Sequence, residues 1–316
     1  GFRPTVKRHA DVCRIEGSVS NKGPYVEIFA QGSEECVNHF IKRIQEQPPK
    51  RAVILKMDVE SLESAIESDT EFEVKSGANA ESDSKERFRI IESEKEEGVI
   101  FVSPDIAICP ECKKELYDKR DRRYLHPFIN CTCCGPRLTI LDSMPYDRVR
   151  TSMGEFPMCE KCEWEYTHAK TRRFDAQPVC CNECGPEVYL LGRPERGADA
   201  IRYTRKMISE GGIVAIKGIG GFHLCCDALK EEAVAALRTR KKRPMKPFAV
   251  MMKDLSVVKR ECEAAPYVEE ILDGHQKPII LLPKKAGGRL CESVAPDNPK
   301  IGVMLPYAPI QLLLFD

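Results

Sequence analysis

A chain of 316 residues is long enough for two or three domains, at roughly 150 residues a domain. Its 49 lysines and arginines balance 49 acidic residues, so no overall field draws it to nucleic acid or to an anionic membrane. Its apolar runs, such as residues 279–282, are far shorter than the ~20 residues that cross a bilayer, and no signal-peptide core is present, so we expect a soluble, cytoplasmic protein without a membrane partner.

The first part of the chain mixes helical and strand patterns. The expected elements are, in chain order, a helix at 4–13, strands at 17–21 and 25–29, a helix at 33–44, and strands at 52–57 and 88–92. Ser33 is a typical N-cap residue for the second helix. This order predicts a small α+β sandwich of ferredoxin-like type with its first strand missing.

Eight of the 16 cysteines form four Cys-x2-Cys pairs. Each member of the first two pairs recurs 50 residues later (159 against 109), as do an Arg-Arg and a Gly-Pro dipeptide, which indicates two copies of one module. The first cysteine cluster comprises Cys109, Cys112, Cys131 and Cys134. The second cysteine cluster comprises Cys159, Cys162, Cys181 and Cys184.

The spacing of each cluster is typical of zinc ligands. Zn²⁺ prefers four thiolates in a tetrahedron, and a turn with two intervening residues directs two sulfurs at one ion. We therefore expect two structural zinc ions, which support folding and not catalysis because four thiolates leave no position for water. Disulfides or a redox pair are the alternatives. The other eight cysteines are expected to be packing residues, and little regular structure is predicted between residues 109 and 186.

Zinc modules often bind nucleic acid, and arginines of this region could contact phosphates. These arginines are Arg120, Arg122, Arg123, Arg172 and Arg173. Acidic residues stand among them, namely Glu111, Asp118, Asp121 and Glu163. The mixed charge favours a solvated or interdomain face over a DNA-binding or RNA-binding surface.

From about residue 198, helical and strand patterns alternate, which predicts an α/β domain. A strand at 213–217 leads into a glycine-rich turn that is neither a Walker motif nor a dinucleotide fingerprint. A helix at 230–240 ends in a run of cations that, taken alone, suits the dipole of a helix C-terminus. The chain ends in an apolar run, 312–315, without a closing turn, so we expect this domain to be incomplete.

The N-terminal residues carry a first resemblance. Gly1-Phe2-Arg3 and Gly17-Ser-Val-Ser-Asn21 resemble, in residue type and spacing, the signature of the acylphosphatase family. The resemblance implies that Arg3 binds a phosphoryl group and that Asn21 positions the nucleophilic water. A guanidinium can grip phosphate with two parallel hydrogen bonds, and a neutral amide can hold water without titrating. The family's first strand and part of its phosphate loop are missing before Gly1.

The C-terminal part carries a second resemblance. A strand with Lys217-Gly-x-Gly-Gly, a helix, and Lys241-x-Arg243-Pro-x-Lys246-Pro resemble the YrdC-like domains that bind ATP and make carbamoyl-type adenylates. The resemblance implies that Lys241, Arg243 and Lys246 hold nucleotide phosphates and the small carboxylate, with Lys217 as a further candidate. Clustered cations suit a site that brings two anions together.

In order, an acylphosphatase-like domain (1–93), a duplicated zinc-finger module (94–190) and a truncated YrdC-like domain (198–316) resemble the HypF family. The resemblance implies a carbamoyltransferase of [NiFe]-hydrogenase maturation that hydrolyses carbamoyl phosphate and adenylates the carbamate with ATP and Mg²⁺, releasing pyrophosphate. A further C-terminal domain would then carbamoylate a cysteine of the partner HypE, for synthesis of the cyanide ligand. The zinc modules would act as interdomain struts.

Two alternatives remain open. A threonylcarbamoyl-adenylate synthase of tRNA modification would explain residues 198–316 but would leave Arg3, Asn21 and the eight spaced cysteines without a role. A zinc-stabilised nucleic-acid-binding module would use the cations between residues 238 and 246.

Overall fold

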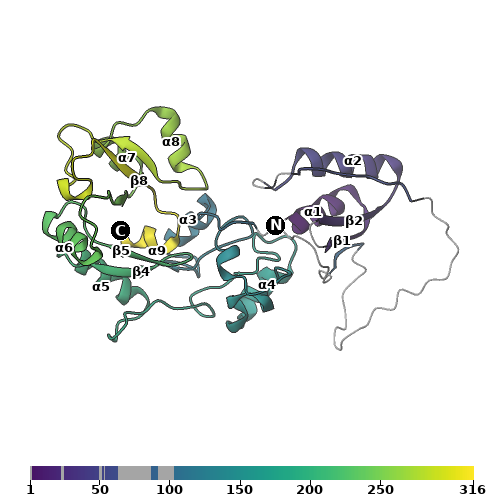
Figure 1. Ribbon diagram of the computed structural model, residues 1–316. Helices are drawn as coiled ribbons and strands as arrows, with labels where there is room; N and C mark the ends of the chain where they lie inside the picture. Colours follow the sequence, from purple (N-terminus) through teal and green to yellow (C-terminus); the bar gives the residue numbers. More distant parts are fainter. Residues whose placement is uncertain (1, 23–24, 50–51, 53, 63–86, 92–102) are drawn as a thin grey trace. The chain divides into compact units, whose positions relative to one another are not determined.

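The computed structural model describes residues 2–22, 25–49, 52, 54–62, 87–91 and 103–316. They belong to two compact units, Gly1–Ile100 and Phe101–Asp316 (Figure 1). The predicted boundary at residues 93 and 94 lies outside the described residues, and the cysteine modules share one unit with the C-terminal α/β part. Among the described residues, none of the helices combines the length and the apolar character that a membrane span requires.

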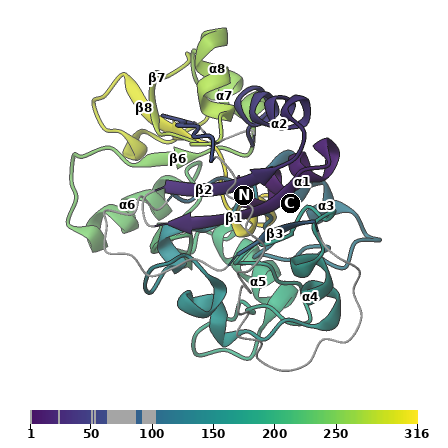
Figure 2. The same ribbon diagram turned by 90° about the vertical axis from the view of Figure 1, so that its right-hand side faces the viewer.

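Among its described residues, the first unit contains two helices and one small sheet (Figure 2). Its elements are α1 (Phe2–Cys13), β1 (Glu16–Lys22), β2 (Tyr25–Gln31), α2 (Glu34–Glu46) and β3 (Phe88–Ile90). The strand order is β2-β1-β3, with β1 antiparallel to β2 and parallel to β3. Ser33 caps α2 as predicted, since its hydroxyl accepts a hydrogen bond from the backbone N–H of Cys36. Both helices pack on the sheet in one core, where Phe40 meets Phe88 edge-on.

One predicted strand of this unit is not found among the described residues. Within the range 52–57, Ala52 and Ile54–Met57 are described and none of them is in a strand. Ile54 and Met57 are partly buried and pack against the core. A strand requires backbone hydrogen bonds to a neighbour, which apolar alternation by itself does not supply. The last predicted strand is confirmed for Phe88–Ile90, while residue 92 lies outside the described part.

The cysteine modules are more regular than predicted. Each begins with a short helix, α3 (Pro110–Tyr117) and α4 (Glu160–Thr167), and three 3₁₀ turns lie between them, η1 (Leu138–Ile140), η2 (Arg148–Arg150) and η3 (Ser152–Glu155). Each helix has only eight residues, little more than two turns, so its hydrophobic period is a weak signal in the sequence. Helices of this length are also marginal in isolation. Cys109 and Cys159 occupy the N-cap positions, which ties each helix to its cysteine cluster.

The C-terminal part confirms the α/β pattern. Its elements are α5 (Gly197–Ser209), β4 (Val214–Lys217), β5 (Phe222–Cys225), α6 (Glu231–Lys241), β6 (Ala249–Met251), α7 (Leu255–Glu261), α8 (Pro266–Asp273), β7 (Ile280–Pro283), η4 (Glu292–Val294), β8 (Lys300–Met304) and α9 (Pro309–Leu314). β4 and β5 form an antiparallel pair around the predicted glycine turn. The other sheet has the order β6-β8-β7, with β6 parallel and β7 antiparallel to β8.

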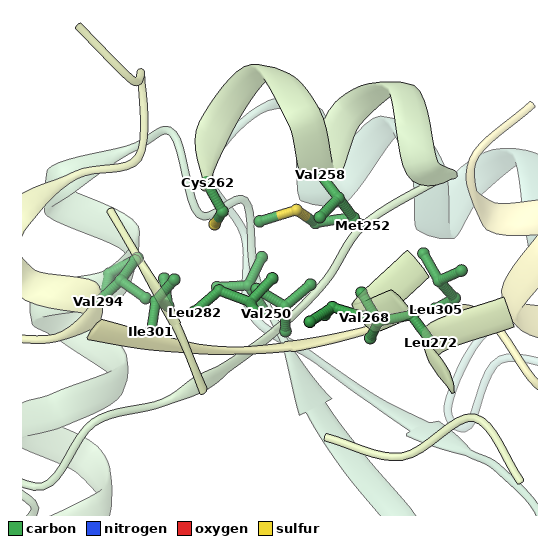
Figure 3. Close-up of a cluster of buried hydrophobic side chains, with 12 residues drawn as sticks. Val250, Met252, Val258, Cys262, Val268, Leu272, Leu282, Val294, Ile301 and Leu305 are labelled. Carbon is green, nitrogen blue, oxygen red and sulfur yellow. The ribbon is translucent and has the colours of Figure 1, made fainter. Parts of the chain in front are cut away.

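The core of this part lies between the three-stranded sheet and the helices α7 and α8. Val250 of β6 and Ile301 of β8 pack with Val258 of α7 and Leu272 of α8, and all four side chains are buried (Figure 3). Burying aliphatic side chains of this size contributes roughly 1.5–3 kcal/mol each. Val234 of α6 belongs to the same core, so the two elements that flank the loop with Arg243 and Lys246, α6 and β6, are both anchored in it.

Candidate functional site

The two residues of the predicted phosphate site lie in the first unit. Arg3 is in the first turn of α1 and is buried, and Asn21 lies near the end of β1 with partial exposure. Val6 and Ala10 of α1 pack with Val19 of β1 in one core, so both elements belong to the same packed assembly. A joint role for Arg3 and Asn21 stays a prediction.

Both cysteine clusters fit a tetrahedral metal centre. Within each cluster the four Sγ atoms lie within 4.8 Å of one another. Cys131 Sγ lies 3.8 Å from Cys109 Sγ and 3.7 Å from Cys134 Sγ, and the equivalent pairs of the second cluster are both 3.8 Å apart. Zinc–sulfur bonds of about 2.3 Å give tetrahedron edges of about 3.8 Å, whereas a disulfide is about 2.05 Å long. All 16 cysteines are free, so the geometry favours zinc over disulfides.

The repeated Gly-Pro dipeptide has a local role beside each cluster. Gly135 has φ of +99°, and a Cβ there would lie 2.7 Å from the Cβ of Asn130. A Cβ on the equivalent Gly185 would lie 2.9 Å from the Cβ of Cys180. Only glycine fits where the ligand loop folds back this closely.

The arginines of each module pair with the other module. Arg122 and Arg123 of the first repeat both donate hydrogen bonds to Glu165 of the second, with Arg122 Nη2 2.6 Å from Glu165 Oε2. Arg172 and Arg173 of the second repeat both donate to Glu115 of the first, with Arg172 Nη2 2.8 Å from Glu115 Oε1. Of the two predicted environments, solvent and an interdomain face, these four arginines occupy an interface between the modules. Arg123 and Arg173 are buried there.

The predicted set of arginines also contained Arg120, which behaves differently. Its side chain is exposed and pairs with Asp118 in its own module. The contrast between Arg120 and the buried Arg123 is therefore a matter of tertiary position, since both stand in one cation-rich stretch.

The two glutamates of the interface are held in the charged form. Burial alone would raise the pKa of Glu165, but the hydrogen bond and charge of Arg123 and the charges of Arg173 and Arg122 lower it below its ordinary value. The pKa of Glu115 is lowered in the same way, with Arg173 and Arg172 outweighing burial. Sequence reasoning missed both glutamates, although they recur 50 residues apart (165 against 115) like the cysteines.

The first cysteine cluster is built into the C-terminal part of its unit. Its four cysteines share a core with Ile201 of α5 and with Leu312 and Leu313 of α9. The backbone N–H of Ile108 donates to the carbonyl of Tyr307 at 3.0 Å. This packing gives the strut hypothesis a physical basis on the side of the YrdC-like part.

The four cations predicted to bind nucleotide lie around α6 and the glycine turn. Lys217, Lys241 and Lys246 are exposed, and the ammonium of Lys217 lies 5.3 Å from the centroid of the Phe222 ring. Arg243 is turned to its own loop, where it donates to the carbonyl oxygens of Lys246 at 3.0 Å and of Pro247 at 2.5 Å.

A buried arginine that sequence reasoning missed holds this loop. Arg238 donates hydrogen bonds to five carbonyl oxygens, those of Arg243, Pro244, Lys246, Ser293 and Val294. Its guanidinium also lies 4.6 Å from the centroid of the Phe248 ring. The cation run gave no signal that this one member points inward.

A cavity of about 680 Å³ lies beside the glycine turn. Gly218, His223, Lys253 and Tyr307 are among its lining residues, and the four predicted cations are not. His223 Nε2 lies 3.0 Å from the hydroxyl of Tyr307. Sequence reasoning singled out neither side chain.

Three protein-family profiles match the chain. The acylphosphatase family matches residues 1–74, the HypF finger family matches 108–141 and 158–191, and the Sua5/YciO/YrdC family, described as telomere recombination, matches 206–316.

Curated relatives match the chain over its whole length. Carbamoyltransferase HypF2 of Cupriavidus necator is 44% identical over 100% of this chain and 38% of the relative. Carbamoyltransferase HypF of Synechocystis sp. is 42% identical over 99% of this chain and 39% of the relative. The chain therefore spans about two fifths of the length of these relatives.

Two solved structures are similar to this chain over nearly its whole length. The crystal structure of full-length HypF in the phosphate- and nucleotide-bound form superposes with a TM-score of 0.88 at 45% identity. The match covers 100% of this chain and 39% of the other. The structure of the HypF of T. kodakarensis gives a TM-score of 0.84 at 42% identity, over 99% of this chain and 38% of the other.

Proposed function

The chain belongs to the HypF carbamoyltransferase family, and we propose that it carries the sites for hydrolysis and adenylation in carbamoyl transfer during [NiFe]-hydrogenase maturation. The observation that carries the proposal is the match of the whole chain to a full-length HypF solved with phosphate and nucleotide. The order of acylphosphatase, zinc-finger and YrdC-like parts supports it further.

The first proposed step is hydrolysis of carbamoyl phosphate to carbamate and inorganic phosphate. Arg3 would bind the phosphoryl group, because a guanidinium offers paired donors and neutralises its charge. Asn21 would orient the attacking water, and its amide remains neutral at any physiological pH. The buried position of Arg3 supports this role, since a charge removed from water binds an anion more strongly.

The second proposed step joins carbamate to ATP. A carbamate oxygen attacks the α-phosphorus, pyrophosphate leaves, and carbamoyl adenylate forms, with Mg²⁺ accompanying the nucleotide. Lys241, Arg243, Lys246 and Lys217 would neutralise the phosphates and the carboxylate. Arg243 would exchange its hydrogen bonds to loop carbonyls for bonds to the ligand, while Arg238 keeps the loop in place.

The last proposed step lies with the whole protein. A domain beyond this chain would transfer the carbamoyl group from the adenylate to a cysteine thiol of HypE, releasing AMP, and that group would become the cyanide ligand of the hydrogenase iron. Free cysteines and ATP both suit a cytoplasmic location.

The test follows ATP in the full-length protein that contains this chain. We expect carbamoyl phosphate to drive conversion of ATP to AMP and pyrophosphate. Turnover with threonine and bicarbonate alone would show the proposal to be wrong and would favour a threonylcarbamoyl-adenylate synthase. Retention of the protein on nucleic acid at moderate salt would instead favour a zinc-stabilised nucleic-acid-binding module.

Two variants separate the steps. Arg3→Ala should abolish phosphate release from carbamoyl phosphate and, with it, AMP formation. Arg243→Ala should reduce AMP formation and leave phosphate release intact. Arg202→Ala, which removes an exposed guanidinium on α5 paired with Asp199, is the matched control and should change neither.

A further inference from the structure

Each cysteine cluster is approached by guanidinium groups from the opposite repeat. Arg172 of the second repeat places Nη2 3.5 Å from Cys112 Sγ of the first cluster. Arg122 of the first repeat places Nη2 3.2 Å from Cys162 Sγ and Nη1 3.7 Å from Cys159 Sγ of the second cluster. These N–H groups donate to the sulfur atoms, so each repeat supplies a donor to the cysteine cluster of the other.

The backbone of each donor is attached beside the cluster that it serves. Thr132, between two ligands of the first cluster, donates its hydroxyl to the carbonyl of Arg172 at 2.6 Å. Its equivalent Asn182, between two ligands of the second cluster, donates Nδ2 to the carbonyl of Arg122 at 3.4 Å. The donors are therefore aimed by the ligand loops themselves.

The neighbouring arginines, Arg123 and Arg173, also donate hydrogen bonds to the opposite repeat. Arg173 Nε donates to the carbonyl of Asn130 at 2.9 Å, and Arg123 Nε donates to the carbonyl of Cys180 at 2.8 Å. Asn130 and Cys180 each immediately precede a ligand of the opposite cluster. Two independent sets of contacts thus join each ligand loop to the other repeat.

The arginine donors from the opposite repeat affect metal binding through electrostatics. A Zn²⁺ ion with four thiolates carries net negative charge, and N–H donors to sulfur spread that charge in a site shielded from water. Partners of metal ligands orient the ligands and tune affinity, and their loss typically costs about 10–100-fold in metal affinity. Glu115 and Glu165 hold the guanidiniums in position.

We infer that metal retention at each cysteine cluster depends on arginines of the opposite repeat, so that the two centres are energetically coupled. Arg172 lies in the chain between Cys162 and Cys181, both ligands of the second cluster. Closing the second cluster therefore positions the donor to the first, and the reverse holds for Arg122. Such coupling is reciprocal by linkage.

The test uses the zinc-loaded full chain, treated with a chelator and N-ethylmaleimide, with the alkylation of each cysteine followed by peptide mass spectrometry. In Arg172→Gln, Cys109 and Cys112 should be alkylated about tenfold faster than in the unsubstituted chain, although the substitution lies in the second repeat. In Arg122→Gln, the acceleration should appear at Cys159 and Cys162.

Controls make the outcome decisive. Arg120→Gln, an exposed position, should leave every alkylation rate unchanged. Arg172→Lys and Arg122→Lys keep the charge and lose the forked donors, so they should retain the fold and give smaller accelerations at the same opposite cluster. Acceleration confined to the repeat that carries the substitution, or unchanged rates in both glutamine variants, would overturn the inference.

Discussion

The first cysteine cluster is buried at all four residues, whereas Cys159 and Cys184 of the second are partly exposed. The first packs with apolar side chains of α5 and α9, and the second packs with Val179, Ala176 and other residues of its own repeat. The ligand spacings of the two are identical. The difference teaches that the same spacing gathers four sulfurs in both repeats, while the surroundings of the two clusters differ; we therefore expect the loss of one cluster to spread further than the loss of the other.

The largest expected effect comes from breaking one equivalent ligand in each cluster. Cys134→Ser should destabilise the second unit by several kcal/mol, because structural zinc contributes its binding energy to folding. It should also speed amide hydrogen exchange in α5 and α9, which share a core with this cluster. Cys184→Ser should speed exchange in α9 much less, because the second cluster affects the α9 core only through Arg172, the donor that it positions beside the first cluster. Equal loss of protection in α9 for both variants would contradict the comparison.

The next effect tests the interface glutamates. Glu165 has three arginine partners, Arg122, Arg123 and Arg173, whereas Glu115 has two. Glu165→Gln should cost about 3 kcal/mol in the free energy of unfolding, and Glu115→Gln about 2 kcal/mol, since each leaves guanidiniums without their charged acceptor. Urea unfolding of the zinc-loaded chain measures both values. A larger loss in Glu115→Gln would reverse the expected order.

A smaller effect depends on pH and on one asymmetry of the repeats. Burial lowers the pKa of His126 to about 4, with Arg123 acting in the same direction and the hydrogen bond with Asn182 opposing it. The second repeat has Ala176 at the equivalent position. Because the folded pKa is depressed, the contribution of His126 is complete above the unfolded pKa of about 6.5 and declines as pH falls toward 4.

The measurement compares the original chain with His126→Gln. Between pH 7 and pH 5 the original chain should lose about 2 kcal/mol more stability than the variant. Loss of zinc in acid affects both chains, so the difference between their unfolding midpoints isolates the histidine. Identical pH dependence in the two chains would refute this assignment.

The smallest effect is expected at the exposed position of the first repeat. Arg120 and its equivalent Lys170 are both exposed. Arg120→Gln removes a surface pair with Asp118, and such pairs add little to stability because water and salt screen them. Thermal unfolding should give the same midpoint as the original chain. A clear shift would mean that Arg120 belongs to the interface between the repeats.

Several elements were predicted correctly because their signals are local. The N-cap at Ser33, the strand pair around residues 23–24 and the strand at Val214–Lys217 each follow from residue type and periodicity within a few positions. The strand expected at 52–57 failed because pairing depends on a partner elsewhere in the chain. The helices α3 and α4 were missed because cysteine ligands anchor them, and hydrophobic period is weak over eight residues.

The sequence by itself determined which eight cysteines form the two clusters and the order of the three parts, because a fixed spacing and a repeat of 50 residues can be read along the chain. Only the tertiary structure decided that Arg123 and Arg173 lie inside the protein, that Arg238 supports the basic loop, and that each repeat supplies donors to the other. The physical reason is that hydrogen bonds and charges act through space, between residues whose separation along the chain carries no signal of their contact.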